Sequence, residues 1–223
     1  MNIKHTVIFT LIIYCIVFYT LWAFVELIIT PQISLLDNDL FETIIKTVLI
    51  KNIVWTGPAF LLIKYFKDDV YVSLKDMFFN TVNWLKYLPV FAFFTIYILV
   101  ASCLLHGGIF VSPDFTYSTL IIVLFVGISE ELVFRGWLLN ATVKGCSKKQ
   151  MWLMLILNAM LFLFIHFPIW IYEKTLFTNF KNMGFLCIIV LGIVFGRAFI
   201  KTKNIMVPIS LHMYWDFLMF IFV

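Results

Sequence analysis

The stretch STLIIVLFVGISEELVFRGWLLNA, residues 118–141, is apolar enough to cross a membrane, yet it contains Glu130, Glu131 and Arg135. An ionised side chain at the centre of a bilayer costs at least about 2.5 kcal/mol on the scales obtained from membrane insertion. Three such groups in one stretch therefore need a common reason. In membrane proteins that reason is usually a polar site between helices.

The composition of the whole chain indicates an integral membrane protein. Of its 223 residues, 63% are hydrophobic and only 13% are charged, about half the charged fraction of an average soluble domain. No internal repeat, low-complexity tract or second soluble unit is evident, so we expect one integral membrane domain over residues 1–223.

Seven hydrophobic stretches approach or exceed the roughly 18 residues that a membrane-spanning helix needs. They are Thr6–Ile29, Ile44–Ile63, Tyr87–His106, Ser118–Ala141, Gln150–Ile171, Met183–Ile200 and Met206–Val223. We therefore predict an all-α fold, a polytopic membrane bundle of about seven transmembrane helices. The second stretch is the weakest, because it contains Lys46, Lys51 and Pro58.

Lysines are distributed unevenly between the connections. Those after the second, fourth and sixth stretches hold nine lysines, whereas those after the first, third and fifth hold only Lys174 and Lys181. By the positive-inside rule the lysine-rich connections are cytoplasmic, which places the amino terminus inside the cell and Val223 outside. The net charge of +4 follows from this topology and suits an anionic lipid leaflet. Membrane lipids are therefore expected partners, and nucleic acid is not.

The cellular source is also suggested by residue usage. Lys, Ile, Phe and Asn are abundant and the only arginines are Arg135 and Arg197, a pattern typical of a low-GC bacterial genome. We expect an integral protein of a bacterial plasma membrane.

The polar residues of the fourth stretch divide into two faces. Glu131 and Arg135 are four positions apart, so on a helix they share a face and can form an ion pair. Glu130 is rotated from Glu131 by about 100° and faces elsewhere. One glutamate can then neutralise the arginine while the other stays available in a cleft of low dielectric, as a general base requires. A purely structural ion pair is the alternative interpretation.

Two later stretches also present polar residues on one face. Phe162 and His166 are four positions apart, and Pro168 is expected to bend or end the helix just beyond the histidine. His212 and Asp216 have the same spacing, so the carboxylate can orient the imidazole or bind a water beside it.

A free glutamate and two histidines facing one interior suit the hydrolysis of a peptide bond. That reaction needs a base to activate water, together with donors or a metal to stabilise the oxyanion. Counted from the predicted helix ends at about 1.5 Å per residue, however, Glu130 lies roughly 18 Å deep, His166 roughly 24 Å and His212 roughly 9 Å. A helix tilt, a break near Pro168 or different helix ends must bring these residues together.

At this point the residues resemble the signature of a known family. In chain order the motifs are Glu130-Glu131-Leu-Val-Phe-Arg135, Phe162-Leu-Phe-Ile-His166 and His212-Met-Tyr-Trp-Asp216. They are similar to the E-E-x-x-x-R, F-x-x-x-H and H-x-x-x-N/D motifs of the CAAX protease and bacteriocin-processing family (CPBP, or Abi) of intramembrane proteases, which includes the type II CAAX prenyl endopeptidases. The resemblance covers residues 118–217, and the first three stretches carry no matching signature.

The resemblance implies a bundle of eight or a similar number of helices that cleaves a membrane-associated peptide or protein near its end. It also implies that Glu130 and His166 activate water, and that His212 and Asp216 stabilise the oxyanion or complete a metal site. Three further residues would support the site structurally: Glu131, Arg135 and Phe162. Many members have asparagine at the position of Asp216, and an ionised carboxylate cannot donate to an oxyanion.

The cofactor requirement stays open at this stage. Two histidines and carboxylates on separate helices satisfy a catalytic zinc site, for which Glu130, His166, His212 and Asp216 would be the ligands. The same groups can activate water without a metal. Zinc dependence and a metal-free mechanism are therefore both consistent with the sequence.

Two other classes of protein fit parts of the pattern. A non-catalytic relative, such as a bacteriocin-immunity or scaffold protein, would keep the fold and bind a peptide or partner. A small transporter would use the glutamate and histidines as a proton relay. The intact set of Glu130, His166 and His212 favours the enzyme, and the lack of an internal repeat disfavours a symmetric transporter.

Two features are expected to have no part in the chemistry. Glu26, near the outer end of the first stretch, is expected to reach the lipid headgroups. Gly192 and Gly196 form a G-x-x-x-G pattern, which predicts close packing of one helix against another.

Overall fold

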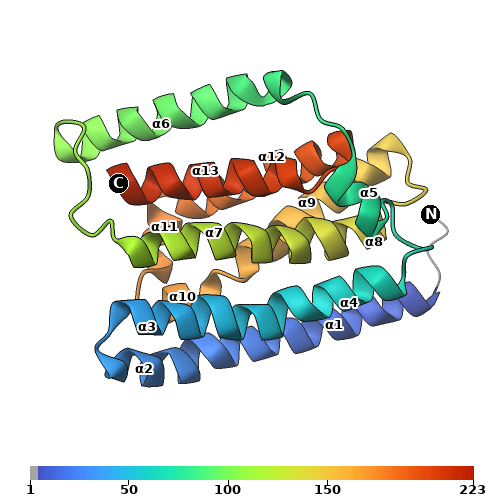
Figure 1. Ribbon diagram of the computed structural model, residues 1–223, viewed down its shortest axis with the longest axis horizontal. Coiled ribbons are helices and arrows are strands. Elements are labelled where there is room, and N and C mark those ends of the chain that lie inside the picture. The colour runs from blue at the N-terminus through green and yellow to red at the C-terminus, as the bar shows by residue number, and fades with distance from the viewer. Residues whose placement is uncertain (1–4) are drawn as a thin grey trace.

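Long helices lie side by side in the computed structural model, which describes residues 5–223, and every regular element in that range is helical (Figure 1). Six segments are long and apolar enough to cross a membrane, and a shorter apolar helix follows them. The predicted all-α, polytopic membrane bundle is therefore confirmed. The predicted position of the amino terminus concerns residues 1–4, which lie outside the described range.

The membrane-crossing segments match the predicted stretches closely. They are His5–Leu36, Asp39–Tyr65, Trp84–His106, Tyr117–Thr142, Lys148–Tyr172 and Gly184–Thr202, followed by the shorter Met206–Phe222. The largest difference is in the first segment, which continues to Leu36 rather than ending at Ile29. The last helix has 17 residues and is therefore about 25 Å long, slightly less than the roughly 30 Å of a hydrocarbon core.

Several of these segments are interrupted by non-α turns. The α-helices are α1 (His5–Phe24), α2 (Thr30–Ile33), α3 (Asp39–Thr43), α4 (Gly57–Tyr65), α5 (Leu74–Phe79), α6 (Leu88–His106), α7 (Tyr117–Glu131), α8 (Asn140–Thr142), α9 (Lys148–Phe164), α10 (Phe167–Tyr172), α11 (Leu176–Lys181), α12 (Gly184–Thr202) and α13 (Met206–Phe222). The π-helical turns are Val25–Ile29, Ile44–Ile50, Asn52–Thr56 and Leu132–Leu139, and the 3-10 turns are Ser34–Leu36 and Trp84–Tyr87. π-Helical turns are rare and occur often at functional sites. The longest of them directly follows Glu131.

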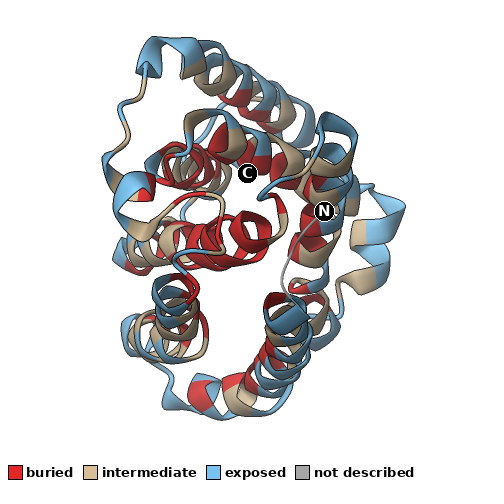
Figure 2. Cartoon of the chain, turned by 90° about the vertical axis from the view of Figure 1, so that its right-hand side faces the viewer, coloured by how far each residue is buried: buried red, intermediate tan, exposed pale blue. Residues whose placement is uncertain are grey.

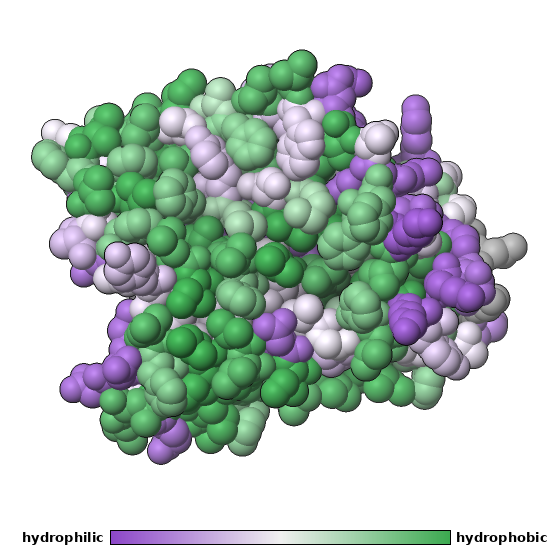
Figure 3. All heavy atoms as spheres, viewed as in Figure 1, coloured by the Kyte–Doolittle hydropathy of each residue, from purple (hydrophilic) through white to green (hydrophobic). Residues whose placement is uncertain are grey.

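The two ends of the bundle differ in character. The start of α1, helix α5 and the connection between α8 and α9 lie at one end, and the carboxyl terminus lies at the other (Figure 1). Hydrophilic residues are densest at the end that holds α5, while the face between the two ends is largely hydrophobic (Figure 3). The lysine-rich connections thus gather at one end, as the predicted topology requires. The assignment of that end to the cytoplasm stays a prediction.

Buried residues concentrate in the middle of the bundle (Figure 2). Every residue from Ser129 to Ala141 is buried, whereas the outer helices carry exposed apolar side chains such as Phe9 and Leu104. The stretch with the paired glutamates is therefore enclosed by other helices rather than by lipid.

Close packing of α12 on α9 holds one side of this centre together. A Cβ atom at Gly192 would lie 3.0 Å from the Cβ of Ala159, and one at Gly196 would lie 2.5 Å from a methyl group of Leu155. Larger residues at either position would push the two helices apart. The predicted role of the G-x-x-x-G pattern in helix packing is therefore confirmed.

Candidate active site

A helix break positions His166. Helix α9 ends at Phe164, and α10 begins at Phe167 with Pro168 in its first turn, because proline cannot continue an α-helix from within. The Nδ1 atom of His166 lies 2.9 Å from the carbonyl oxygen of Phe162. The imidazole meets the Phe162 ring edge-on, with ring centroids 5.3 Å apart. The predicted break beside the histidine is thus present.

The Glu131–Arg135 pair forms as predicted and is fully buried. The Nη1 atom of Arg135 donates to Oε1 of Glu131 at 2.9 Å, and Nη2 donates to the carbonyl oxygen of Gly192 at 3.1 Å. The guanidinium also lies over the ring of Phe162, 4.5 Å from its centroid. Arg135 therefore ties the fourth membrane segment to α12 and α9, which is a structural role.

Glu131 has a second contact that the sequence did not predict. Its Oε1 atom lies 2.8 Å from Nδ1 of His212. A carboxylate only accepts hydrogen bonds, so Nδ1 carries the proton and Nε2 points away from Glu131. The imidazole also stacks on Phe195 at a centroid distance of 5.0 Å. Glu131 and Phe195 thus fix the orientation of His212, a task that we had expected of Asp216.

Glu130 is not free, and the expectation that it stays unpaired is wrong. Its Oε1 atom accepts a hydrogen bond from Nζ of Lys51 at 2.9 Å, and both side chains are buried. The ammonium group also lies 4.5 Å from the ring centroid of Trp55 and 5.4 Å from that of Trp22. The second segment therefore supplies a cation to the site. The available signal was Lys51 itself, an ionisable residue in an apolar stretch, which usually marks a functional or paired position.

Glu130, His212 and Asp216 converge. The Nε2 atom of His212 lies 3.9 Å from Oε2 of Glu130 and 3.5 Å from Oδ2 of Asp216. The large difference in depth expected between Glu130 and His212 is therefore removed in the fold. No hydrogen bond joins His166 to Glu130 within residues 5–223. His166 is instead linked to His212 through Phe162, whose ring meets both imidazoles edge-on.

The charges of this cluster imply a shared proton. Lys51 and Arg135 are two cations, and three carboxyl groups lie beside them: Glu130, Glu131 and Asp216. A buried cluster is least costly when its charges balance, and two cations against three carboxylates leave one negative charge to be neutralised by a proton. A proton on Nε2 of His212, which lies 3.5 Å from Oδ2 of Asp216 and 3.9 Å from Oε2 of Glu130, would supply this balance.

A polar cavity of about 290 Å³ leads to this cluster from the Asp39 end of the second segment. Glu26, Lys46, Thr47 and Lys51 line it. Glu26 is only 3% exposed and pairs with Lys46 at 2.8 Å, so the expectation that it reaches the lipid headgroups is wrong. Its carboxylate points inward because a cation meets it there.

The side chains do not fit a zinc site as they are arranged. Although Glu130, His212 and Asp216 lie near one another, no three His, Cys, Asp or Glu side chains in the described part of the chain are placed so that together they could hold a metal ion. The ammonium of Lys51, 2.9 Å from Glu130, also repels a divalent cation beside that carboxylate. The mechanism proposed below therefore contains no step through a metal.

Comparison with known proteins found a similarity to one family model. Residues 112–218 match the family model described as type II CAAX prenyl endopeptidase Rce1-like. Comparisons with curated proteins and with solved structures gave no match. The matched residues include the three motifs. Lys51 and most of the residues that line the polar cavity lie outside them.

Proposed function

Residues 112–218 match the type II CAAX prenyl endopeptidase Rce1-like family, and we propose that the chain hydrolyses a membrane-associated peptide or protein near one end. The convergence of Glu130, His212 and Asp216 supports this proposal most directly. Two atoms of this group, Oε2 of Glu130 and Nε2 of His212, are 3.9 Å apart. One water molecule can therefore contact a base and a hydrogen-bond donor together.

Glu130 is the proposed general base. Lys51 holds its Oε1 atom, which leaves Oε2 facing the centre of the site. Oε2 takes a proton from water as the water oxygen attacks the scissile carbonyl carbon, and that proton later passes to the leaving amine. General-base catalysis of this kind contributes roughly 10²–10⁴-fold to a rate.

His212 is the proposed donor to the oxyanion. With Nδ1–H held by Glu131 at 2.8 Å, a proton on Nε2 can point at the oxygen that becomes negative. Preorganised donors of this type need no reorientation during the reaction, which is why they lower the barrier. In this proposal the Asp216 carboxylate, 3.5 Å from Nε2, keeps the imidazole cationic by its charge and leaves Nε2–H to the oxyanion, and His166 helps to bind the water.

Water can reach the base through the polar cavity. Asp39 and Lys51 both line it, and these residues are twelve positions apart on one helical segment, which corresponds to about 18 Å. A hydrolase whose catalytic base is enclosed by helices needs such a route. In this proposal the cavity opens on the side opposite the lysine-rich connections, which is the outer side of a bacterial plasma membrane if those connections are cytoplasmic.

One observation favours a non-catalytic alternative. The buried ion pair with Lys51 occupies one oxygen of Glu130, and an immunity or scaffold protein of the same fold could use this pair for packing alone. The two functions differ in whether peptide bonds are cut, so the substrate search described next separates them.

The test is a comparison of membrane peptides from cells with and without the protein. New peptide ends should appear only when the protein is present, and the sequences around those ends identify the substrate. A His212→Ala variant at equal abundance is the control. Peptide ends that are the same in all three samples would contradict the proposed hydrolysis.

A further inference from the structure

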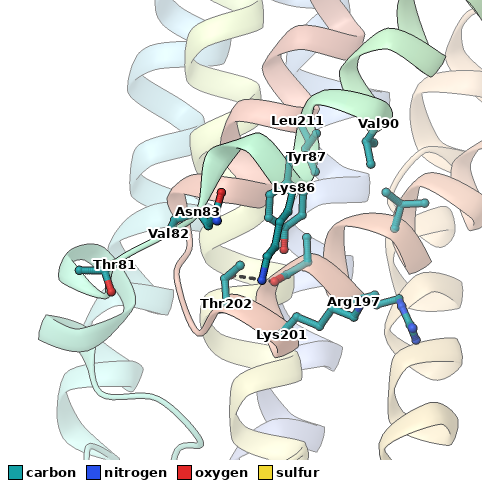
Figure 4. A pocket seen from close by; sticks show the side chains of 12 residues that line it. Thr81, Val82, Asn83, Lys86, Tyr87, Val90, Arg197, Lys201, Thr202 and Leu211 are labelled. Atoms are coloured by element: carbon teal, nitrogen blue, oxygen red, sulfur yellow. Dashed lines mark hydrogen bonds between the residues drawn. The ribbon is translucent and has the colours of Figure 1, made fainter.

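A basic cavity lies at the lysine-rich end of the bundle, and neither Glu130, His166, His212 nor Asp216 is in its lining. It has a volume of about 950 Å³ and is lined by the start of α6, the end of α12 and residues 81–83 (Figure 4). Lys86, Arg197 and Lys201 contribute three cations, and no acidic residue is among the side chains that line it. Within residues 5–223 no carboxylate forms an ion pair with any of the three. The cavity therefore favours an anion.

The cations lie at the ends of candidate membrane-crossing segments, where lipid headgroups are expected. Lys86 precedes α6 by two residues, and Arg197 and Lys201 lie one turn apart near the end of α12. The guanidinium of Arg197 also lies over the ring of Trp152, 5.0 Å from its centroid. Trp152 belongs to the lining of a smaller neighbouring cavity that Arg197 and Lys201 also line, so the guanidinium lies at the border between the two cavities.

An apolar cavity continues from the basic one toward the middle of the membrane. It has a volume of about 550 Å³, and Val90 and Val194 line both cavities. Along α12 its lining runs from Val194 to Leu186 and beyond to Met183. Met183 precedes the first residue of α12 and therefore lies at the end opposite Lys201. Val190, in the same lining, is eleven positions from Lys201, about 16 Å along the helix, which is close to half of the roughly 30 Å hydrocarbon core, or one leaflet.

We propose that the two cavities together bind one anionic phospholipid. Its phosphate-bearing headgroup contacts Lys86, Arg197 and Lys201, and one acyl chain lies along the apolar cavity between α6 and α12. The lining combines cations that have no carboxylate partner with an apolar cavity long enough for an acyl chain. An anionic phospholipid has both the charge and the acyl chain that match this lining. The proposal depends on the membrane location and not on the proposed hydrolysis.

The first experiment compares headgroups. Purified protein in a neutral detergent is mixed with phosphatidylglycerol or with phosphatidylcholine of the same acyl chains, and bound lipid is counted by native mass spectrometry. Each cation near the headgroup should contribute about fivefold to the affinity for an anionic lipid. The parent should therefore prefer phosphatidylglycerol by at least about tenfold, and Arg197→Gln with Lys201→Gln should weaken its binding by about thirtyfold.

The matched control removes two lysines from the same end of the bundle. Lys75 and Lys149 are exposed and line neither cavity, so Lys75→Gln with Lys149→Gln should keep the preference for phosphatidylglycerol. Equal binding of the two lipids by the parent, or an unchanged preference in the Arg197→Gln/Lys201→Gln variant, would overturn the proposal.

A second pair of variants tests the acyl chain. Val190, at the exposed rim of the apolar cavity, is changed to Trp to fill it, and Val100, which is similarly exposed on α6 but outside the lining, is changed to Trp as the control. Only Val190→Trp should lower phosphatidylglycerol binding, and glycerophosphoglycerol, which lacks acyl chains, should not compete. Unchanged binding in Val190→Trp would overturn the proposal. A second result would also overturn the proposal: the parent shows no preference between the two lipids, and a lipidated peptide displaces phosphatidylglycerol. That result would mean that the apolar cavity binds substrate.

Discussion

Lys51 and Glu130, 79 positions apart in the chain, form a buried ion pair with Nζ and Oε1 separated by 2.9 Å. The pair joins a helix outside the family-matched residues to the glutamate that we propose as the base. It leaves one carboxylate oxygen bound and the other directed at His212, 3.9 Å away. Lys51 is therefore a positioning residue in this proposal: it acts through Glu130 and not on the substrate.

Replacing Lys51 by Met should destabilise the protein. The change leaves the buried Glu130 carboxylate without its partner, which typically costs about 3–5 kcal/mol. Thermal unfolding in detergent measures the effect. The double variant Lys51→Met/Glu130→Gln has no unpaired charge at this position, so it should recover much of the lost stability.

The control for this prediction is Lys64→Met, an exposed lysine at the end of the same segment. This variant should unfold like the parent. Additive losses in the Lys51→Met/Glu130→Gln double variant would contradict the account, because additivity means that the two side chains do not interact.

Replacing Arg135 by Leu should lower the amount of folded protein in the membrane. The variant removes the donors to Glu131 and to the carbonyl oxygen of Gly192, both of which are buried. Unpairing a buried carboxylate costs several kcal/mol, and Glu131 also holds His212. Membrane abundance and peptide cleavage are measured together. Normal abundance with full activity would show that this ion pair does not hold the site.

The topology predicts where a reporter works. A reporter that is active only outside the cytoplasm should be active when fused after Val223 and silent when inserted at Ser147, in the lysine-rich connection between α8 and α9. The opposite pattern, or activity at both positions, would mean that the assignment of the cytoplasmic end is wrong.

A chelator should leave cleavage unchanged. The side chains around Glu130 do not group as a zinc site, and Lys51 already supplies a cation there. Product formation by the purified protein is measured before and after chelation. Activity that is lost on chelation, restored by zinc and absent from His212→Ala or Asp216→Ala variants would instead establish a metal mechanism.

Local patterns in the sequence predicted much of the fold and part of the site. Hydropathy located the six membrane-crossing segments, because the bilayer requires about twenty apolar residues per crossing, and also the shorter apolar helix that follows them. The spacing of four predicted the Glu131–Arg135 pair because one helix carries both residues. Pro168 marked the break beside His166 for an equally local reason.

The contacts that the sequence did not predict join residues far apart in the chain. The partner of Glu130 comes from the second segment, and the residue that orients His212 comes from the fourth. Neither contact follows from helical spacing, since each depends on how separate helices pack. The π-helical turn after Glu131 also changes the helix geometry directly after the paired glutamates. Depths estimated at about 1.5 Å per residue assume ideal α-helices and therefore omit this change.

The most direct test of the account is the rate of peptide cleavage by the Glu130→Gln variant. The substitution keeps the volume of the side chain and removes only the base. The purified variant is reconstituted in liposomes at the same protein amount as the parent, beside the Lys51→Met/Glu130→Gln variant, in which the unpaired ammonium is also removed. The account predicts that both variants insert and fold but cleave at least about 100-fold more slowly. Cleavage at the parental rate by either folded variant would contradict the assignment of Glu130 as the base.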